Sequence, residues 1–158
     1  MDVSFRYAER KDGSLILKFI KDLAEYEGLL NEVTADENTL DEWIFQKKKA
    51  EVIFAVYEGK EVGFALFFNN FSTFLGKAGL YLEDLYVVPE YRGKGFGKAL
   101  LSKLSKIANK EGLGRMEWWC LDENKPSVDF YISLGAEPMK DWTVYRLSGD
   151  TLRKFPSK

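Results

Sequence analysis

The feature that most constrains this chain is a glycine-rich turn between an apolar segment and an amphipathic one. Leu80–Val88 is mostly apolar and is followed by Pro89, which is typical of a strand that ends at the proline. The turn itself, Arg92–Lys98, carries glycine at three alternate positions. From about Phe96 to Lys110 the apolar residues recur at helical spacing and lysines occupy the other face. Strand, turn and helix in direct succession predict an α/β fold.

The glycine turn has the chemistry of an anion-binding site. Glycine lets the backbone approach a ligand, and a helix start presents unpaired N–H groups and the positive end of its dipole. Because Arg92 and Lys98 add charge, a pyrophosphate is the expected ligand. The G-x-G-x-G spacing fits neither a P-loop nor a Rossmann fingerprint. A plain glycine turn with solvated lysines is the alternative.

The remaining segments continue the α/β pattern. Further strands are expected at Phe5–Tyr7, Val52–Tyr57, Val62–Phe68, Met116–Leu121 and Thr143–Leu147, the last closing the sheet. Further helices are expected at Gly13–Tyr26, from the capping-box pattern Thr34–Glu37 past Trp43, and from about Pro126 to Gly135. With 158 residues and no visible repeat or linker, the sequence predicts one domain over residues 1–158 with a mixed sheet.

The composition excludes several chemistries. The chain has no histidine, which removes the Ser-His-Asp and Cys-His triads and leaves no zinc site of ordinary composition. A formal net charge of −2 argues against a nucleic-acid partner. The single cysteine, Cys120, cannot form an intramolecular disulfide, so a cytoplasmic protein is expected and the thiol is interpreted as an inert core group. No apolar run predicts a signal peptide or a membrane span.

The chain resembles the GNAT acetyltransferases, and within them the spermidine/spermine N-acetyltransferase group. Arg92–Gly97 is similar to the R/Q-x-x-G-x-G/A loop that holds the pyrophosphate of coenzyme A in that family. Three other segments, Ile20–Glu27, Tyr81–Val87 and Asn124–Tyr131, resemble the group in the same order. The resemblance implies a GNAT-type mixed sheet flanked by helices, acetyl-CoA as the acetyl donor, a small amine as the acceptor, and a homodimer.

The resemblance also implies where acetyl-CoA binds. The backbone of Leu85–Val87 is expected to contact the pantetheine arm and the acetyl carbonyl, where an N–H group would stabilise the oxyanion. The glycine loop would hold the pyrophosphate, and Asn124–Ser127 would line the far side of the cofactor. The cofactor residues implied in this way are Leu85, Tyr86, Val87, Arg92, Gly93, Lys94, Gly95, Phe96, Gly97, Lys98, Asn124, Lys125, Pro126 and Ser127.

Two residues are candidates for proton transfer. An amine of the lysine type has a pKa of about 10.4, so a proton must leave before the nitrogen attacks. By the resemblance, Glu83 is the candidate base, acting through water. Tyr131 is the candidate acid for the CoA thiolate, because a phenol and a thiol have ordinary pKa values of about 10 and 8.5. The structural alternatives are a surface carboxylate and a tyrosine that only packs on its neighbours.

The acceptor is expected to carry a carboxylate as well as an amine. The polyamine enzymes have an acidic residue where this chain has Ser72-Thr73, which resembles the thialysine branch, and hydroxyls can hydrogen-bond a carboxylate. The candidate acceptor residues are Tyr26, Glu27, Ser72, Thr73, Glu83, Asp84, Glu117, Trp118 and Trp119. For the two tryptophans, core or dimer packing is an equal alternative. A catalytically silent acyl-CoA-binding module and a protein N-acetyltransferase stay open as other functions.

Overall fold

The computed structural model describes residues 2–157 and divides into two compact units, Met1–Trp119 and Cys120–Lys158. The first unit contains a five-stranded sheet in the order β1-β2-β3-β4-β5. Its strands are β1 (Ser4–Tyr7), β2 (Glu51–Tyr57), β3 (Lys60–Ser72), β4 (Lys77–Val87) and β5 (Met116–Trp118). The first four strands are antiparallel neighbours, and β5 runs parallel to β4. The sheet is therefore mixed, as the sequence predicts.

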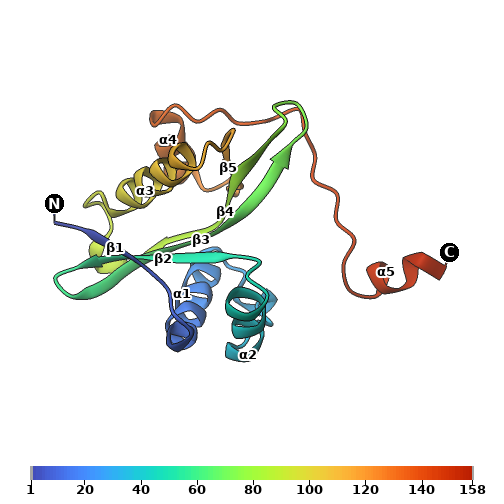
Figure 1. Cartoon of the computed structure of the whole chain (residues 1–158), viewed down its shortest axis with the longest axis horizontal. Coiled ribbons are helices and arrows are strands. Elements are labelled where there is room, and N and C mark those ends of the chain that lie inside the picture. The colour runs from blue at the N-terminus through green and yellow to red at the C-terminus, as the bar shows by residue number, and fades with distance from the viewer. Residues whose placement is uncertain (1, 158) are drawn as a thin grey trace. The chain divides into compact units, whose positions relative to one another are not determined.

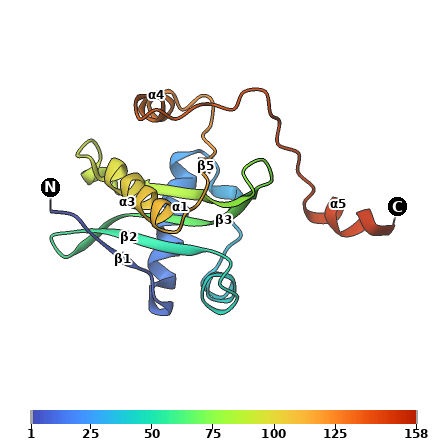
Figure 2. The ribbon, with the colours of Figure 1, turned by 45° about the horizontal axis from the view of Figure 1, so that its top comes forward.

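Helices of the first unit lie on both faces of this sheet. The helices α1 (Gly13–Tyr26) and α2 (Glu37–Leu40), with the π-helical turn η3 (Asp41–Gln46), cover one face, and α3 (Phe96–Lys110) covers the other (Figure 1; the turned view in Figure 2 shows the same arrangement). Short 3-10 turns complete the unit: η1 (Arg10–Asp12), η2 (Leu30–Glu32) and η4 (Pro89–Tyr91). The core beneath α1 and α2 consists of Ile16, Phe19, Leu40, Ile44, Val52, Phe54, Phe64 and Tyr86.

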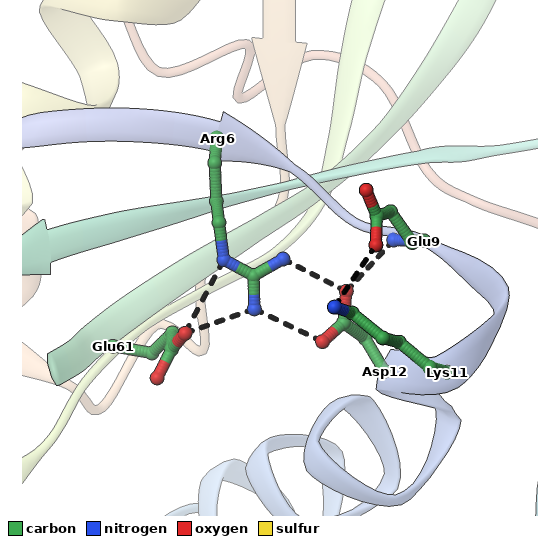
Figure 3. A network of polar contacts seen from close by, with 5 residues as sticks. All are labelled: Arg6, Glu9, Lys11, Asp12 and Glu61. Carbon is green, nitrogen blue, oxygen red and sulfur yellow. Dashed lines mark hydrogen bonds and ion pairs between the residues drawn. The ribbon is translucent and has the colours of Figure 1, made fainter.

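A charged network fixes the start of α1 (Figure 3). Arg6 of β1 donates to both carboxylate oxygens of Asp12, at 2.8 and 2.9 Å, and to Glu61 at 2.9 and 3.2 Å. The Asp12 carboxylate also accepts from the backbone N–H of Glu9 at 2.7 Å. The guanidinium holds the pKa of buried Asp12 below its usual range. The network therefore anchors the N-terminal end of α1 to β1 and β3.

The second unit contains helix α4 (Lys125–Ser133), helix α5 (Gly149–Lys154) and the turn η5 (Phe155–Ser157). The side chain of Asn124 caps α4 by accepting from the backbone N–H of Ser127 at 3.4 Å, and Pro126 lies in the first turn. Gly135 follows the helix with a φ of +93°. The predicted helix and both of its boundary signals are therefore confirmed.

One predicted strand is wrong. Residues 143–147 form no strand, and Tyr145 is 91% exposed. The alternating β-branched and aromatic side chains give this segment strand propensity, but a strand also needs a ladder partner, which it lacks within the described chain. Helix α5 follows this segment and is too short to show an apolar periodicity, so the sequence pattern does not predict it.

Other boundaries also differ. β5 ends at Trp118 rather than Leu121, while β3 extends to Ser72 and β4 begins at Lys77. The first of these follows from the parallel pairing of β4 and β5, which stops at Leu82 and Trp118. The second helix begins after Asp36 rather than Thr34, because Asp36 and Thr39 exchange two capping bonds, at 2.8 and 3.0 Å. Pairing and capping partners decide these ends, and the sequence pattern alone does not specify them.

Candidate active site

The glycine loop has the backbone geometry of an anion cradle. Gly93 and Gly95 have φ values of +73° and +90°, in the left-handed region that favours glycine. Gly95 is the N-cap of α3, so the unpaired N–H groups of the first turn of this helix open at the loop. Phe96 is buried and its ring lies 5.1 Å from Tyr57 and 6.0 Å from Tyr91. These aromatic contacts hold the loop and the helix start together.

Two basic side chains of the loop lie over aromatic rings. The Nε of Arg92 donates to the backbone carbonyl of Val87 at 2.8 Å, and its guanidinium lies 5.0 Å from the ring centre of Tyr26 and 5.3 Å from that of Tyr86. The Nζ of Lys94 lies 5.5 Å from the ring centre of Tyr91. The loop therefore contacts the end of β4 and the end of α1.

One edge of β4 is open beside this loop. β5 pairs with β4 only over Leu80–Leu82, and on its other edge β4 pairs with β3 as far as Val87. Within the described chain, no strand pairs with the β5-side edge of Glu83–Val87. An extended ligand can therefore reach backbone groups of Leu85–Val87, as expected for a pantetheine arm.

A β-bulge rearranges the side chains just before that open edge. Leu66 of β3 is opposite Asp84, but its neighbour Phe67 is opposite Leu82, so Glu83 is the extra residue of the bulge. Paired residues share a face of the sheet, and regular alternation would place Tyr81 and Asp84 on opposite faces. The bulge brings both onto the face that α1 and α2 cover, together with Tyr86.

Acidic groups gather on this face. Burial, with the nearby charges of Glu83 and Glu27, raises the pKa of Asp84 to about 7. The pKa of Glu27 is also raised, first by burial and then by Glu83. Glu27 directly follows the last residue of α1, Tyr26. Clustered carboxylates that raise one another's pKa values favour a cationic ligand such as an ammonium group.

A second group of residues borders this acidic cluster. The ring of Tyr81 lies 5.1 Å from Phe68 and 6.2 Å from Trp119. Burial and the charges of Glu83 and Glu117 raise the pKa of Tyr81 to about 12. Glu117 of β5 accepts a hydrogen bond from the Asn70 side chain at 3.3 Å and pairs with Arg115, also at 3.3 Å. Trp118, next to it, is half-buried in β5.

The two predicted hydroxyl residues differ in accessibility. Ser72 is only 4% exposed, and its Oγ accepts from the backbone N–H of Leu75 at 3.2 Å. This bond closes the turn between β3 and β4, in which Gly76 also donates to the Ser72 carbonyl at 2.8 Å. Thr73 is exposed. Of the pair, Thr73 is therefore the hydroxyl that a ligand can reach.

The predicted residues of the second unit lie on α4 and its cap. Tyr131 is half-buried, and its ring centre lies 5.5 Å from that of Phe130. Lys125 pairs with Asp129 at 3.1 Å across one helical turn. The half-buried thiol of Cys120 contacts the carbonyl of Leu121 at 3.5 Å. The second unit thus brings together Asn124, Lys125, Pro126, Ser127 and Tyr131 on one helical segment.

The other predicted residues all belong to the first unit and fall into two predicted groups. The group at the loop and the open edge is Leu85, Tyr86, Val87, Arg92, Gly93, Lys94, Gly95, Phe96, Gly97 and Lys98. The predicted acceptor group is Tyr26, Glu27, Ser72, Thr73, Glu83, Asp84, Glu117, Trp118 and Trp119, which come from the end of α1, the β3–β4 turn, β4 and the end of β5. The structure brings Glu27, Glu83 and Asp84 together, whereas Ser72 lies opposite Lys77 at the start of β4, away from them.

Three residues near the acceptor group were not predicted: Asn70, Tyr81 and Arg115. Asn70 and Arg115 contact Glu117, and the ring of Tyr81 contacts that of Trp119. Strand alternation was the available signal, but it identifies a shared face only once the register around the bulge is known. Among residues 2–157 no cluster of three or more potential metal ligands occurs. No helix in that range has the length and apolar character needed to cross a membrane.

The fold and the loop together define an α/β acyltransferase class: a mixed sheet with an open β4 edge beside a glycine loop at a helix start. Residues 16–136 match the family described as Acetyltransferase (GNAT) family. The chain belongs to the GNAT acetyltransferases. The resemblance inferred from the sequence is thereby confirmed for the family.

The chain is also similar to individual proteins of known name or structure. The chain is 33% identical to a thialysine N-epsilon-acetyltransferase of Bos taurus, over 99% of this chain and 98% of that protein. It is 47% identical to the L-ornithine N5-acetyltransferase NATA1 of Arabidopsis thaliana, over 58% of this chain and 40% of that longer protein. The solved integron cassette protein VCH_CASS6 from the mobile metagenome of V. cholerae superposes with a TM-score of 0.81 at 28% identity, covering 100% and 99% of the two chains.

Proposed function

We propose that this chain is an acetyl-CoA-dependent N-acetyltransferase whose acceptor is a small amine with a carboxylate, such as thialysine or a lysine-like amino acid. The observation that carries the proposal is a left-handed glycine loop at the start of α3 together with an acidic cluster, Glu27, Glu83 and Asp84, next to the open edge of β4. The similarity to a thialysine N-epsilon-acetyltransferase over nearly the whole chain supports the acceptor class. We further propose one cytoplasmic domain over residues 1–158, acting as a homodimer.

The residues of the loop fit the pyrophosphate of coenzyme A. A Cβ atom added at Gly93 would meet nothing within 4 Å, so a lack of space does not explain the glycine there. Glycine is favoured because the backbone has a φ of +73°, which other residues rarely adopt. Gly95, directly before α3, also has a φ that favours glycine, +90°. Left-handed residues next to a helix start turn successive N–H groups toward one point, which suits a phosphate. Lys94 and Lys98 would add positive charge around it.

The proposed reaction needs one proton removed and one supplied. Glu83, exposed at the bulge, takes the ammonium proton through water, and the neutral nitrogen then forms a bond to the acetyl carbon. Backbone N–H groups of Leu85–Val87 stabilise the charge that develops on the carbonyl oxygen. The bond from carbon to sulfur breaks, and Tyr131 gives its proton to the departing thiolate. The nitrogen loses its second proton at this stage, and that proton restores the Tyr131 phenol through water. Glu27 and Asp84 attract the ammonium group before it loses its proton.

The acceptor preference is tested by comparing kcat/KM for thialysine, 1,3-diaminopropane and spermidine at one pH and salt concentration. We expect thialysine to be preferred over spermidine by about tenfold, which needs only about 1.4 kcal/mol in the transition state. The physical reason is that an acceptor carboxylate gains hydrogen bonds beside Thr73, whereas a distal ammonium there finds no counter-charge.

A matched variant tests the same preference from the opposite direction. Thr73→Asp places a carboxylate at the exposed member of the pair and should move the preference toward the diamine and spermidine. The buried Ser72 is less suitable, since a carboxylate there would disturb the turn. Preference of the wild type for spermidine by tenfold would overturn the assigned acceptor class. Turnover of peptides alone would indicate a protein N-acetyltransferase, and binding without any turnover a silent module.

A further inference from the structure

Arg92 connects the glycine loop to the acceptor end of α1 through its side chain. Its Nε is bound to the carbonyl of Val87, and its guanidinium lies over the rings of Tyr26 and Tyr86 at 5.0 and 5.3 Å. Tyr26 is the last residue of α1, and Glu27 of the acidic cluster follows it directly. One side chain therefore contacts three parts of the fold: the end of β4, the core and the end of α1.

The contacts of Tyr86 make this connection rigid. Tyr86 is only 5% exposed, and its ring centre lies 5.6 Å from that of Phe19 in α1. Burial is the main cause that raises the pKa of the Tyr86 phenol, while the charge and hydrogen bond of Arg92 act in the opposite direction. Because Arg92 is charged and lies at the C-terminal end of α1, the helix dipole also favours its position.

Lys94 of the same loop provides a contrast. Its ammonium lies 5.5 Å from the ring centre of Tyr91, which belongs to η4, the turn that leads into the loop. This contact joins neighbouring residues of one loop and does not reach α1. Lys94 is therefore placed to add charge for a phosphate, whereas the guanidinium of Arg92 is already held by a carbonyl and two rings.

We propose that Arg92 is a positioning residue that couples coenzyme binding at the glycine loop to the placement of Tyr26 and Glu27 at the acceptor site. The inference rests on the proposed function and deepens it. A ligand that orders the loop fixes the backbone of Arg92, and the stacked guanidinium transmits that order to the end of α1. Coupling of this kind is reciprocal, so the acceptor in turn tightens coenzyme binding.

Hydrogen exchange with coenzyme A as the probe tests the coupling without any acceptor. In the wild-type chain, saturating coenzyme A should slow exchange at residues 92–97 and also at residues 23–29. In Arg92→Ala the protection should persist at residues 92–97 and be lost at residues 23–29. Arg92→Lys keeps the charge but not the planar group that stacks, and it should behave like the alanine variant. Lys94→Ala is the control, and at saturating coenzyme A it should keep both regions protected.

Kinetics give a second, independent readout. With acetyl-CoA saturating, Arg92→Ala should raise the KM for thialysine about tenfold while changing the affinity for coenzyme A by less than about threefold. Tyr26→Leu should give the same KM effect, since it removes the ring that Arg92 contacts. The double variant should be no worse than either single variant, because contacting residues with a shared role are not additive. Lys94→Ala should show the reverse split, with weaker coenzyme binding and an unchanged thialysine KM.

The outcomes separate this proposal from the proposed function. If Arg92→Ala loses coenzyme affinity tenfold or more and keeps the thialysine KM, Arg92 is a phosphate ligand and the positioning role is overturned. The positioning role is also overturned if coenzyme A protects residues 92–97 but not residues 23–29 in the wild-type chain. It is likewise overturned if residues 23–29 stay protected in Arg92→Ala. If the wild-type chain binds no coenzyme A at all, the proposed function fails first. Arg92, Tyr26 and Lys94 are all exposed, so the variants are expected to fold.

Discussion

The hydroxyl of Tyr131 belongs to the last step of the proposed reaction, when the thiolate leaves. Tyr131→Phe keeps the half-buried ring beside Phe130 and removes only the proton donor. We expect kcat to fall by about 10²- to 10⁴-fold, as is typical when a general acid is lost, with acetyl-CoA affinity retained. Tyr145→Phe removes an exposed hydroxyl elsewhere in the second unit and serves as the control. Wild-type kcat in Tyr131→Phe would mean that water or another group protonates the thiolate.

Asp84 should make the stability of the protein depend on pH. Its pKa is raised to about 7 in the folded state, against an ordinary value of about 3.9. Between these two values the folded chain binds more protons at this site than the unfolded chain does. The free energy of unfolding therefore falls as pH rises through this range, because the charged form is disfavoured in the fold. The Asp84→Asn variant should lack this decrease in the free energy of unfolding, because its side chain does not titrate.

Thermal unfolding between pH 4 and pH 8 measures this effect. The Tm of Asp84→Asn should increase relative to wild type as the pH rises. Asp122→Asn, at an exposed aspartate of the second unit, should follow the wild-type curve. Parallel curves for the wild type and Asp84→Asn would contradict the raised pKa.

At the scale of elements, the junction between Gly95 and α3 should matter for binding more than for folding. Gly95→Val forces a β-branched residue to a φ of +90° and places its side chain at the helix start. Gly112, at the other end of α3, has a φ of +69°, and a Cβ atom there would meet nothing within 4 Å, so Gly112→Val imposes the same kind of strain away from the loop. We expect both variants to lose stability, of order 1–3 kcal/mol.

Only Gly95→Val should lose affinity for acetyl-CoA in a calorimetric titration, because its side chain blocks the approach of a phosphate to the backbone. Equal affinity for acetyl-CoA in folded samples of both variants would show that the pyrophosphate does not bind at this loop. Circular dichroism would show whether α3 persists in each.

The elements that the sequence predicts well are those whose signals are local. The strand, the glycine loop and α3 lie in one continuous stretch, and α4 carries its own cap in Asn124 and Gly135. The bulge at Glu83 has no local signature, because it is defined only by the register of β4 against β3. The shared face of Tyr81 and Asp84 depends on that register, so the make-up of the acidic cluster was only partly predictable. The strand expected at residues 143–147 failed for the same reason, since its pattern is local and its partner is not.

At the scale of the whole molecule, the exposed apolar segment of the second unit bears on the proposed homodimer. Trp142 is 70% exposed and Tyr145 is 91% exposed, and Val144 and Leu147 are exposed beside them. An aromatic side chain can bury about 150–250 Å² in an interface, so leaving this segment in water is unfavourable. Contiguous apolar exposure of this kind marks an interaction surface. Because the chain itself offers the segment no ladder partner within residues 2–157, we expect a second copy to cover it.

Sedimentation tests this expectation directly. The wild-type chain, of 18.2 kDa, should sediment as a dimer at micromolar concentration. Tyr145→Asp puts a charge into the segment and should shift the population toward monomer, because an unpaired carboxylate is costly to bury in an interface. Ser157→Asp adds the same charge outside the segment and should remain dimeric. Dimers of unchanged affinity in Tyr145→Asp would place the interface elsewhere, and a monomeric wild type would contradict the homodimer itself.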